Sequence, residues 1–278
     1  MPTEYEAIIV DKERGRARIT LNRPEKLNAL SRRLQAELAT ALRDADEDNR
    51  VHSIIIRGAG RSFCAGYDLA APRGANERDG KVYRSNRTFD DDLWQLEKAQ
   101  RLRMVLFDMH KPTIAQVHGY CLAGGTDIAT LCDMVIVADD ARIGFPPARD
   151  LGVLPNQMWL YHIGPQWAKR LLLTGDTITG AEAAEWGLFN RAVPADELDE
   201  TVAAYVAKVA RTPKDIIALQ KQSANRIQEI QGFREAMLQA VEVDAIAHAS
   251  PAVKAINAHI KSHGLQDSLR AFQAGEIP

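Results

Sequence analysis

The sequence predicts a layered α/β fold that ends in an all-helical region, and three observations support this. Short β-branched runs alternate with longer helical patterns up to about residue 195, and no convincing strand follows Pro194. The chain has 278 residues, of which 46% are hydrophobic and 26% charged, so it can bury a full core. We therefore expect an α/β body over residues 1–195 and a helical region over residues 196–278.

The N-terminal segment contains signals for three strands and one helix. Residues 7–10, 17–21 and 53–57 are short β-branched runs, and the isoleucines of the last run indicate a strand buried on both faces. After Ser31, leucine and alanine recur at helical spacing while charged residues fill the other face. This pattern predicts an amphipathic helix, capped by Ser31 and packed on a sheet.

The middle of the chain is predicted to contain a loop, a helix and a strand. Residues 70–92 contain proline, glycine and many charges without periodicity, which predicts a mobile surface loop and a candidate lid. Residues 93–109 follow a helical pattern that Pro112 terminates. Residues 113–118 then predict a strand that opens onto a glycine.

Four further elements are expected before residue 195. Gly124 begins a short apolar helix that runs through Cys132, and residues 134–138 predict the strand after it. Thr179 and Glu182 have the spacing of a capping box at the start of another short helix. The remaining elements are a strand over residues 188–193 and helices over residues 196–210, 214–230, 233–248 and 252–262.

Composition excludes several classes of protein. Lys and Arg total 35 against 37 Asp and Glu, a net charge of −2, so no basic surface for nucleic acid is expected. No run approaches the roughly 18 to 20 apolar residues of a membrane span, and no signal core begins the chain, so we expect a cytoplasmic protein. Cys64, Cys121 and Cys132 lack the spacing of a metal site or a disulfide framework, and we expect reduced thiols and no metal.

Two glycine-containing loops each follow a predicted buried strand, over residues 62–68 and 118–127. Gly124 and its neighbour stand at a helix start, where free N–H groups and the helix dipole favour a developing negative charge. A second N–H near Tyr67 would complete an oxyanion hole with two donors. Alternatively, the glycines only permit tight packing of helix against strand, and the residues alone leave both interpretations open.

Four segments in unbroken order are similar to the signature blocks of the enoyl-CoA hydratase/isomerase (crotonase) family. They are ITLNRPEKLNAL (19–30), SFCAGYDL (62–69), KPTIAQVHGYCLAGGTDIATLCD (111–133) and LTGDTITGAEAAEWGLFNRAVP (173–194). The resemblance implies a spiral of ββα units and a substrate carried as a coenzyme A thioester. It also implies a homotrimer or homohexamer assembled through the C-terminal helices, and no tightly bound cofactor.

The resemblance also assigns roles to residues. It places the oxyanion hole on the backbone amides of Tyr67 and Gly124. Positions that cradle the adenine and pantetheine of coenzyme A fall on Lys26, Leu27, Ala65, Gly66 and Asp68. Asp68 could instead cap its own loop.

The catalytic carboxylates depart from the pattern of the family's hydratases, which use two glutamates. Asp127 stands at the first position and is one methylene shorter; its alternative role is N-terminal helix charge. Pro147 stands at the second position and cannot exchange a proton, so Asp150 becomes a candidate substitute, unless it is a surface turn residue. Asn156 lies close to where dienoyl-CoA isomerases carry another carboxylate, but an amide is not a base.

The resemblance therefore predicts an enoyl-CoA hydratase that stabilises an enolate in an oxyanion hole. Two alternatives follow from Pro147. With one carboxylate, the protein could be an enoyl-CoA isomerase or an acyl-CoA C–C hydrolase. It could also be a non-catalytic subunit that only binds acyl-CoA.

Overall fold

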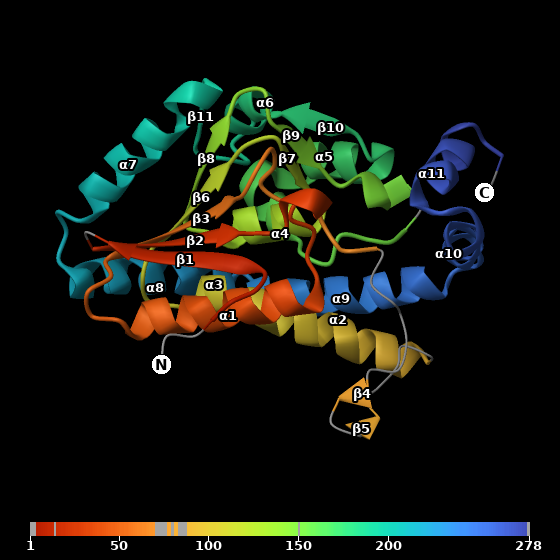
Figure 1. Cartoon of the computed structure of the whole chain (residues 1–278), viewed down its shortest axis with the longest axis horizontal. Coiled ribbons are helices and arrows are strands. Elements are labelled where there is room, and N and C mark those ends of the chain that lie inside the picture. The colour runs from red at the N-terminus through yellow and green to blue at the C-terminus, as the bar shows by residue number, and fades with distance from the viewer. Residues whose placement is uncertain are drawn as a thin grey trace.

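A six-stranded sheet forms the centre of the molecule (Figure 1), in the strand order β1-β2-β3-β6-β8-β11. The computed structural model describes residues 4–13, 15–69, 77–78, 81–82, 88–149 and 151–276. The six strands are β1 (Ile8–Glu13), β2 (Arg16–Leu21), β3 (Ser53–Gly58), β6 (Thr113–Val117), β8 (Met134–Ala138) and β11 (Arg191–Val193). Strands β1 and β2 form an antiparallel hairpin, and every other neighbouring pair in this sheet is parallel.

A second, three-stranded sheet has the order β10-β9-β7, and its strands are β7 (Tyr120–Leu122), β9 (Arg142–Gly144) and β10 (Thr177–Thr179). The chain passes from β6 directly into β7 and from β8 into β9, so neighbouring strands of one sheet continue as neighbours in the other. This repetition agrees with the ββα units that the family resemblance implied. The sequence did not indicate these short strands, because three residues are too few for an alternation of apolar and polar residues to be recognised.

The first helices cover one side of the large sheet. Helix α1 (Arg32–Glu47) follows the 3₁₀ turn η1 (Pro24–Lys26) and begins as expected, with the Ser31 hydroxyl accepting a hydrogen bond from the Leu34 amide at 3.1 Å. Its buried residues are Leu34, Leu38, Ala39, Ala41, Leu42 and Ala45. In Figure 1, α1, α2 (Phe89–Arg103) and α9 (Phe233–Ala249) lie side by side, and contacts join α2 to both.

The predicted loop over residues 70–92 is partly wrong. Helix α2 already begins at Phe89, because the Thr88 hydroxyl caps it by accepting from the Asp91 amide at 3.0 Å. Within the same stretch, β4 (Glu77–Arg78) pairs with β5 (Lys81–Val82). Residues 70–76, 79–80 and 83–87 lie outside the described part of the chain, and so does most of the candidate lid. The expected helix 93–109 is divided, with α3 (Val105–Asp108) following α2.

Two of the three central helices connect the small sheet to the large sheet, and the third connects two strands of the small sheet. Helix α4 (Gly124–Leu131) is buried along its whole length, and the 3₁₀ turn η2 (Pro146–Arg149) follows β9. Helix α5 (Met158–Thr174) was not predicted, because Gly164 and Pro165 within it resemble a helix break and do produce a kink. Helix α6 (Gly180–Glu185) begins with the predicted capping box of Thr179 and Glu182.

The last third of the described chain is helical, as predicted. It comprises η3 (Ala195–Glu197), α7 (Leu198–Val209), α8 (Lys214–Ile230), α9, α10 (Pro251–His263) and α11 (Leu265–Gln273). Helix α11 was not predicted. Because α9 packs along α2, the helical region contacts the α/β body, and the division at residue 195 stays a prediction.

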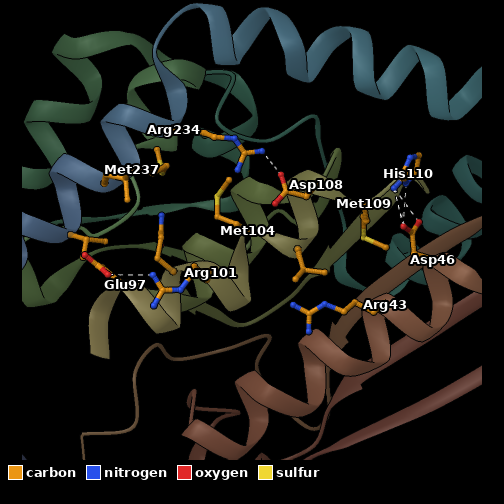
Figure 2. A pocket seen from close by; sticks show the side chains of 14 residues that line it. Arg43, Asp46, Glu97, Arg101, Met104, Asp108, Met109, His110, Arg234 and Met237 are labelled. Carbon is orange, nitrogen blue, oxygen red and sulfur yellow. Dashed lines mark hydrogen bonds and ion pairs between the residues drawn. The ribbon is translucent and has the colours of Figure 1, made fainter. Parts of the chain in front are cut away.

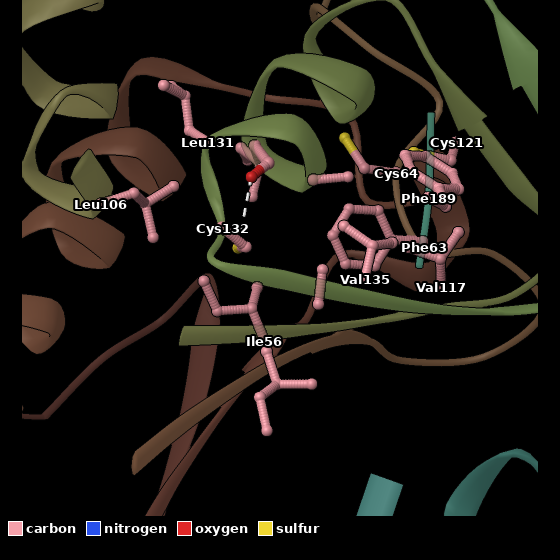
Figure 3. Packing of buried hydrophobic residues seen from close by; sticks show 14 of the residues in the cluster. Ile56, Phe63, Cys64, Leu106, Val117, Cys121, Leu131, Cys132, Val135 and Phe189 are labelled. Carbon is pink, nitrogen blue, oxygen red and sulfur yellow. Dashed lines mark hydrogen bonds between the residues drawn. The ribbon is translucent and has the colours of Figure 1, made fainter. Parts of the chain in front are cut away.

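Part of the core lies between the large sheet and α4, and the buried face of α1 belongs to the same apolar cluster. Figure 3 shows Ile56 of β3, Val117 of β6, Val135 of β8 and Leu131 of α4 within one apolar cluster. Each fully buried side chain of this size contributes about 1.5–3 kcal/mol to folding. Cys64, Cys121 and Cys132 are buried and unpaired. Within the described residues, no helix combines the length and apolar character needed to cross a bilayer.

Candidate active site

The two glycine-containing loops meet at the N-terminus of α4. The loop after β3 pairs with β7, because the Cys64 amide donates to the Tyr120 carbonyl at 2.9 Å and the Leu122 amide donates to the Cys64 carbonyl at 3.0 Å. Helix α4 begins directly after β7. Backbone pairing therefore places the segment that ends at Tyr67 beside the first turn of the helix.

Glycine is required at this junction because the two segments are in close contact. A Cβ on Gly124 would lie 2.7 Å from Leu30 Cδ1 and 2.9 Å from Tyr67 Cε1. A Cβ on Gly66, whose φ is +104°, would lie 2.8 Å from the Cβ of Ala123. The packing explanation of these glycines is therefore sound, and it leaves open a further role for their amides.

The amides of Tyr67 and Gly124 donate no hydrogen bond to any group within the residues that the structure describes. Gly124 is the first residue of α4, so its N–H has no acceptor in the helix. On either side of Tyr67, the Gly66 carbonyl accepts from the Leu30 amide at 2.7 Å and the Asp68 amide donates to the Leu30 carbonyl at 3.3 Å. The chain thus satisfies the groups flanking Tyr67 and leaves the Tyr67 N–H itself free.

The positions assigned to coenzyme A come from two adjoining segments. The Ala65 amide donates to the Leu27 carbonyl at 2.9 Å, so the segment after η1 lies against the loop that contains Gly66. Lys26 is exposed at the end of η1. Asp68 forms an ion pair with Arg23 at 2.8 Å.

Asp127 lies on the first turn of α4 and is 1% exposed. Its Oδ2 accepts a hydrogen bond from the Tyr67 hydroxyl and lies 3.7 Å from Arg103 Nε. Its Oδ1 has no hydrogen-bond partner within the described residues, although it is buried. One carboxylate oxygen is therefore held by the protein, and the other has its lone pairs unused.

Burial raises the pKa of Asp127 to about 6, against the charge of Arg103 and the hydrogen bond from Tyr67, which both lower it. Burial also raises the pKa of the Tyr67 hydroxyl well above its ordinary value, so Tyr67 remains a donor. Asp127 therefore keeps its proton to higher pH than an ordinary carboxyl group does, a property common among groups that exchange protons in catalysis.

Sequence reasoning missed Arg103, the buried cation of this cluster. Its guanidinium donates to Gln100 Oε1 at 2.9 Å and to Gln35 Oε1 at 3.3 Å, and it lies 5.6 Å from the centre of the Tyr67 ring. In sequence, a basic residue in the last turn of a helix has an ordinary explanation, attraction to the helix dipole. Only its packing against α4 reveals the contact with Asp127.

The other candidates for proton transfer have different outcomes. Asp150 lies outside the described residues. Pro147 lies in η2, where its carbonyl accepts from the Leu151 amide at 2.9 Å. Asn156 is buried and donates to the backbone carbonyl of Asp127 at 3.2 Å, while its Oδ1 accepts from the Met158 amide at 2.9 Å. Its amide therefore has a structural role.

A cavity of about 580 Å³ lies elsewhere, between α1, α2, α3 and α9. Figure 2 shows its charged lining, which includes an ion pair of Asp108 with Arg234 and one of Glu97 with Arg101 at 3.2 Å. None of the predicted site residues lines it. Within the described part of the chain, no three His, Cys, Asp or Glu side chains gather in a way that could hold a metal ion.

Comparison with known proteins places this geometry in a family. Residues 11–258 match the family model for enoyl-CoA hydratase/isomerase. The chain belongs to the enoyl-CoA hydratase/isomerase family. The predicted resemblance is thereby confirmed, and the protein is an enzyme of this family, which acts on coenzyme A thioesters.

Curated relatives share about a third of the sequence over most of its length. A probable enoyl-CoA hydratase of Mycobacterium bovis is 34% identical over 226 residues, which cover 80% of this chain and 82% of the relative. A crotonyl-CoA hydratase of Syntrophomonas wolfei is 32% identical, with the same coverage of 80% and 82%.

Solved structures confirm the crotonase-like fold. An enoyl-CoA hydratase from Mycobacterium smegmatis superimposes with a TM-score of 0.87 at 36% identity, over 95% of this chain and 92% of the other. An enoyl-CoA hydratase/isomerase from Xanthobacter autotrophicus Py2 gives a TM-score of 0.87 at 31% identity, over 99% and 100% of the two chains. The helical C-terminal region is part of this shared fold.

Proposed function

We propose that the protein is an enoyl-CoA hydratase, which adds water across the double bond conjugated to a coenzyme A thioester. One observation supports this most strongly: two unused backbone amides, of Tyr67 and Gly124, adjoin a buried carboxylate with one unused oxygen, Asp127 Oδ1. The hydratase names of the relatives agree with it.

In the proposed reaction, the thioester carbonyl accepts hydrogen bonds from the amides of Tyr67 and Gly124. When the oxygen of water attacks the β-carbon, an electron pair moves onto that carbonyl oxygen and forms an enolate. Losing one such donor typically raises the barrier by about 3 to 4 kcal/mol.

Asp127 supplies the proton transfers in this scheme. Its ionised carboxylate takes one proton from the attacking water, which leaves a hydroxyl on the β-carbon. The same carboxyl group then returns the proton to the α-carbon as the enolate collapses. One water is consumed and one hydroxyl and one hydrogen are added, so a single carboxylate is sufficient although Pro147 replaces the second.

Double-bond isomerisation is the second candidate, and Pro147 is the observation that favours it. Moving a double bond along the acyl chain requires one group to carry a proton between two carbons, and Asp127 meets that need. Hydrolysis of a C–C bond in a β-dicarbonyl acyl-CoA would use the same oxyanion hole with water.

The test is to mix the enzyme with crotonyl-CoA and longer 2-enoyl-CoAs and follow the loss of the conjugated thioester absorbance. We expect turnover that falls by about a hundredfold or more in Asp127→Asn, because the amide cannot accept the proton. Glu242→Gln, an exposed change of the same type on α9, serves as the control. Binding of the thioester without turnover at any chain length contradicts the hydratase, and conversion of 3-enoyl-CoA to 2-enoyl-CoA then identifies the isomerase.

Coenzyme A enters this proposal as the carrier part of the substrate, with no tightly bound cofactor. We assign its cradle to the segments that pair through Leu27 and Ala65, with the residues Lys26, Leu27, Ala65, Gly66 and Asp68. Asp150 remains a candidate second acid.

We also propose a cytoplasmic location and a homotrimer or homohexamer. The location agrees with three unpaired thiols, and the assembly agrees with the exposed apolar residues of α8.

A further inference from the structure

A cluster of three titratable side chains joins α9, in the C-terminal helical region, to α2 of the α/β body. Asp244 and His248 lie on α9, and Asp244 Oδ1 is 3.7 Å from His248 Nε2. The other ring nitrogen of His248, Nδ1, lies 2.7 Å from Oδ2 of Asp92 on α2. Asp244 is 5% exposed, so this carboxylate is nearly removed from water.

Asp244 binds the loop of residues 151–157, which runs from η2 to α5. Its Oδ1 accepts a hydrogen bond from the Val153 amide at 2.8 Å. A Cβ on Gly152 would lie 2.5 Å from the same oxygen and 3.3 Å from His248 Nε2. The loop therefore fits closely against Asp244, and only glycine at residue 152 permits this approach.

The other end of the same loop is bonded to Asp127. Asn156 is 1% exposed and donates from Nδ2 to the Asp127 carbonyl at 3.2 Å. A continuous set of contacts thus runs from α9 through Val153 and Asn156 to the backbone of the candidate acid–base residue.

Charge also connects the two ends. Burial raises the pKa of Asp244, against the charge of His248 and the hydrogen bond from Val153, which lower it. The Asp244 charge in turn contributes to the raised pKa of Asp127, while Arg103 lowers the pKa of both carboxyls. Asp127 therefore contacts Tyr67 and Arg103 on α2, and the charge of Asp244 on α9 acts on its pKa.

We infer that Asp244, supported by His248 and Asp92, is a positioning residue of this site: it holds the loop 151–157, and thereby Asn156, against Asp127. The inference rests on the proposed function and extends it, because it gives α9, a helix of the C-terminal region, a part in positioning the candidate acid–base residue. The loop follows η2, so α9 also supports the segment next to Pro147, the residue at the position of the second glutamate of the family's hydratases.

The test compares Asp244→Ala and Asp244→Asn with the matched control Glu242→Gln, an exposed acid on the same helix. Hydrogen–deuterium exchange is measured for peptides covering the loop and α4, and the pH profile of kcat and KM is measured with crotonyl-CoA. Alanine removes the acceptor for Val153, so we expect exchange in the loop to rise and kcat to fall by about tenfold or more, with a smaller change in KM.

The variant Asp244→Asn keeps an oxygen that can accept from the Val153 amide, and it removes the negative charge of residue 244. We therefore expect loop exchange close to that of the unchanged enzyme, and an acid limb of the pH profile displaced to lower pH, because a negative charge that raises the pKa of Asp127 is lost. Substitution of a residue with a purely structural role would not shift the acid limb of the pH profile. Should Asp244→Ala fail to fold, Asp244→Asn and His248→Gln decide the question by the same two readouts.

The inference is overturned if loop exchange and kcat in Asp244→Ala match those of Glu242→Gln. If the unchanged enzyme hydrates no enoyl-CoA, the proposed function fails separately. In that case the exchange data by themselves decide the inference about Asp244. Faster exchange in both the loop and α4 of Asp244→Ala supports it, and unchanged exchange in α4 contradicts it.

Discussion

Tyr67 uses two separate atoms for two separate tasks. Its backbone N–H is the proposed donor to the thioester oxygen, and its hydroxyl bonds to Asp127 Oδ2. The hydroxyl and Arg103 both favour the ionised carboxylate, while burial opposes them and prevails, which leaves the pKa of Asp127 at about 6. The environment thereby keeps a carboxyl group close to the pH at which it can both take and return a proton.

Tyr67→Phe separates these two tasks, since it removes the hydroxyl and keeps the amide. The hydrogen bond lowers the pKa of Asp127, so its loss raises that pKa, and the acid limb of kcat/KM should move to higher pH. The measurement is kcat/KM for crotonyl-CoA across the acid and neutral range. Tyr205→Phe on α7 is the control, and a limb that stays in place or moves to lower pH contradicts the proposed role of the hydroxyl.

Helix α4 is the element that brings the amide of Gly124 and the carboxylate of Asp127 together. Two adjacent glycines open it, and they differ in what a side chain would meet. A Cβ on Gly124 would meet the side chains of Leu30 and Tyr67, which can move. A Cβ on Gly125 would lie 2.4 Å from the backbone carbonyl oxygen of Cys64, which is fixed by pairing with β7.

Alanine at each glycine should therefore have a different effect. Gly124→Ala displaces the Tyr67 ring, so we expect a large loss of kcat with a modest fall in the melting temperature. Gly125→Ala forces backbone apart, and we expect the larger destabilisation, about 1–3 kcal/mol or more. Thermal unfolding and steady-state kinetics on both variants test this. Equal losses of stability in the two variants would contradict the prediction that Gly125→Ala is the more destabilising one.

Local signals account for the elements that the sequence predicted. Ser31 and Thr179 cap their helices with their own side chains, and the β3 isoleucines mark a strand buried on both faces. Helix α5 was missed because the break at Gly164 is visible in the sequence, whereas the tertiary packing that tolerates this break is not. Arg103 and Asp244 were missed for the same reason, since their roles depend on neighbours brought close only by tertiary packing.

At the scale of the whole molecule, α8 has two faces of different character. Lys221 is 8% exposed and joins the helix to the body, with its ammonium group 2.9 Å from Asp133 Oδ2 and 2.9 Å from the Leu106 carbonyl. The opposite face exposes apolar side chains at a spacing that aligns them along one side of the helix. They are Ile216, Leu219, Ile227 and Ile230, exposed by 43%, 60%, 57% and 78%.

Such a row on a folded chain indicates a surface that another protein covers, and a second copy is the occupant that the proposed trimer or hexamer supplies. We expect the double variant Leu219→Glu, Ile227→Glu to lower the mass measured by sedimentation to that of a monomer, because charges would be buried at the interface. Ile9→Glu, which changes a 45% exposed apolar residue on β1, is the control. The interface lies elsewhere if the double variant keeps the mass of the unchanged protein, and the assembly itself is refuted if the unchanged protein sediments as a monomer.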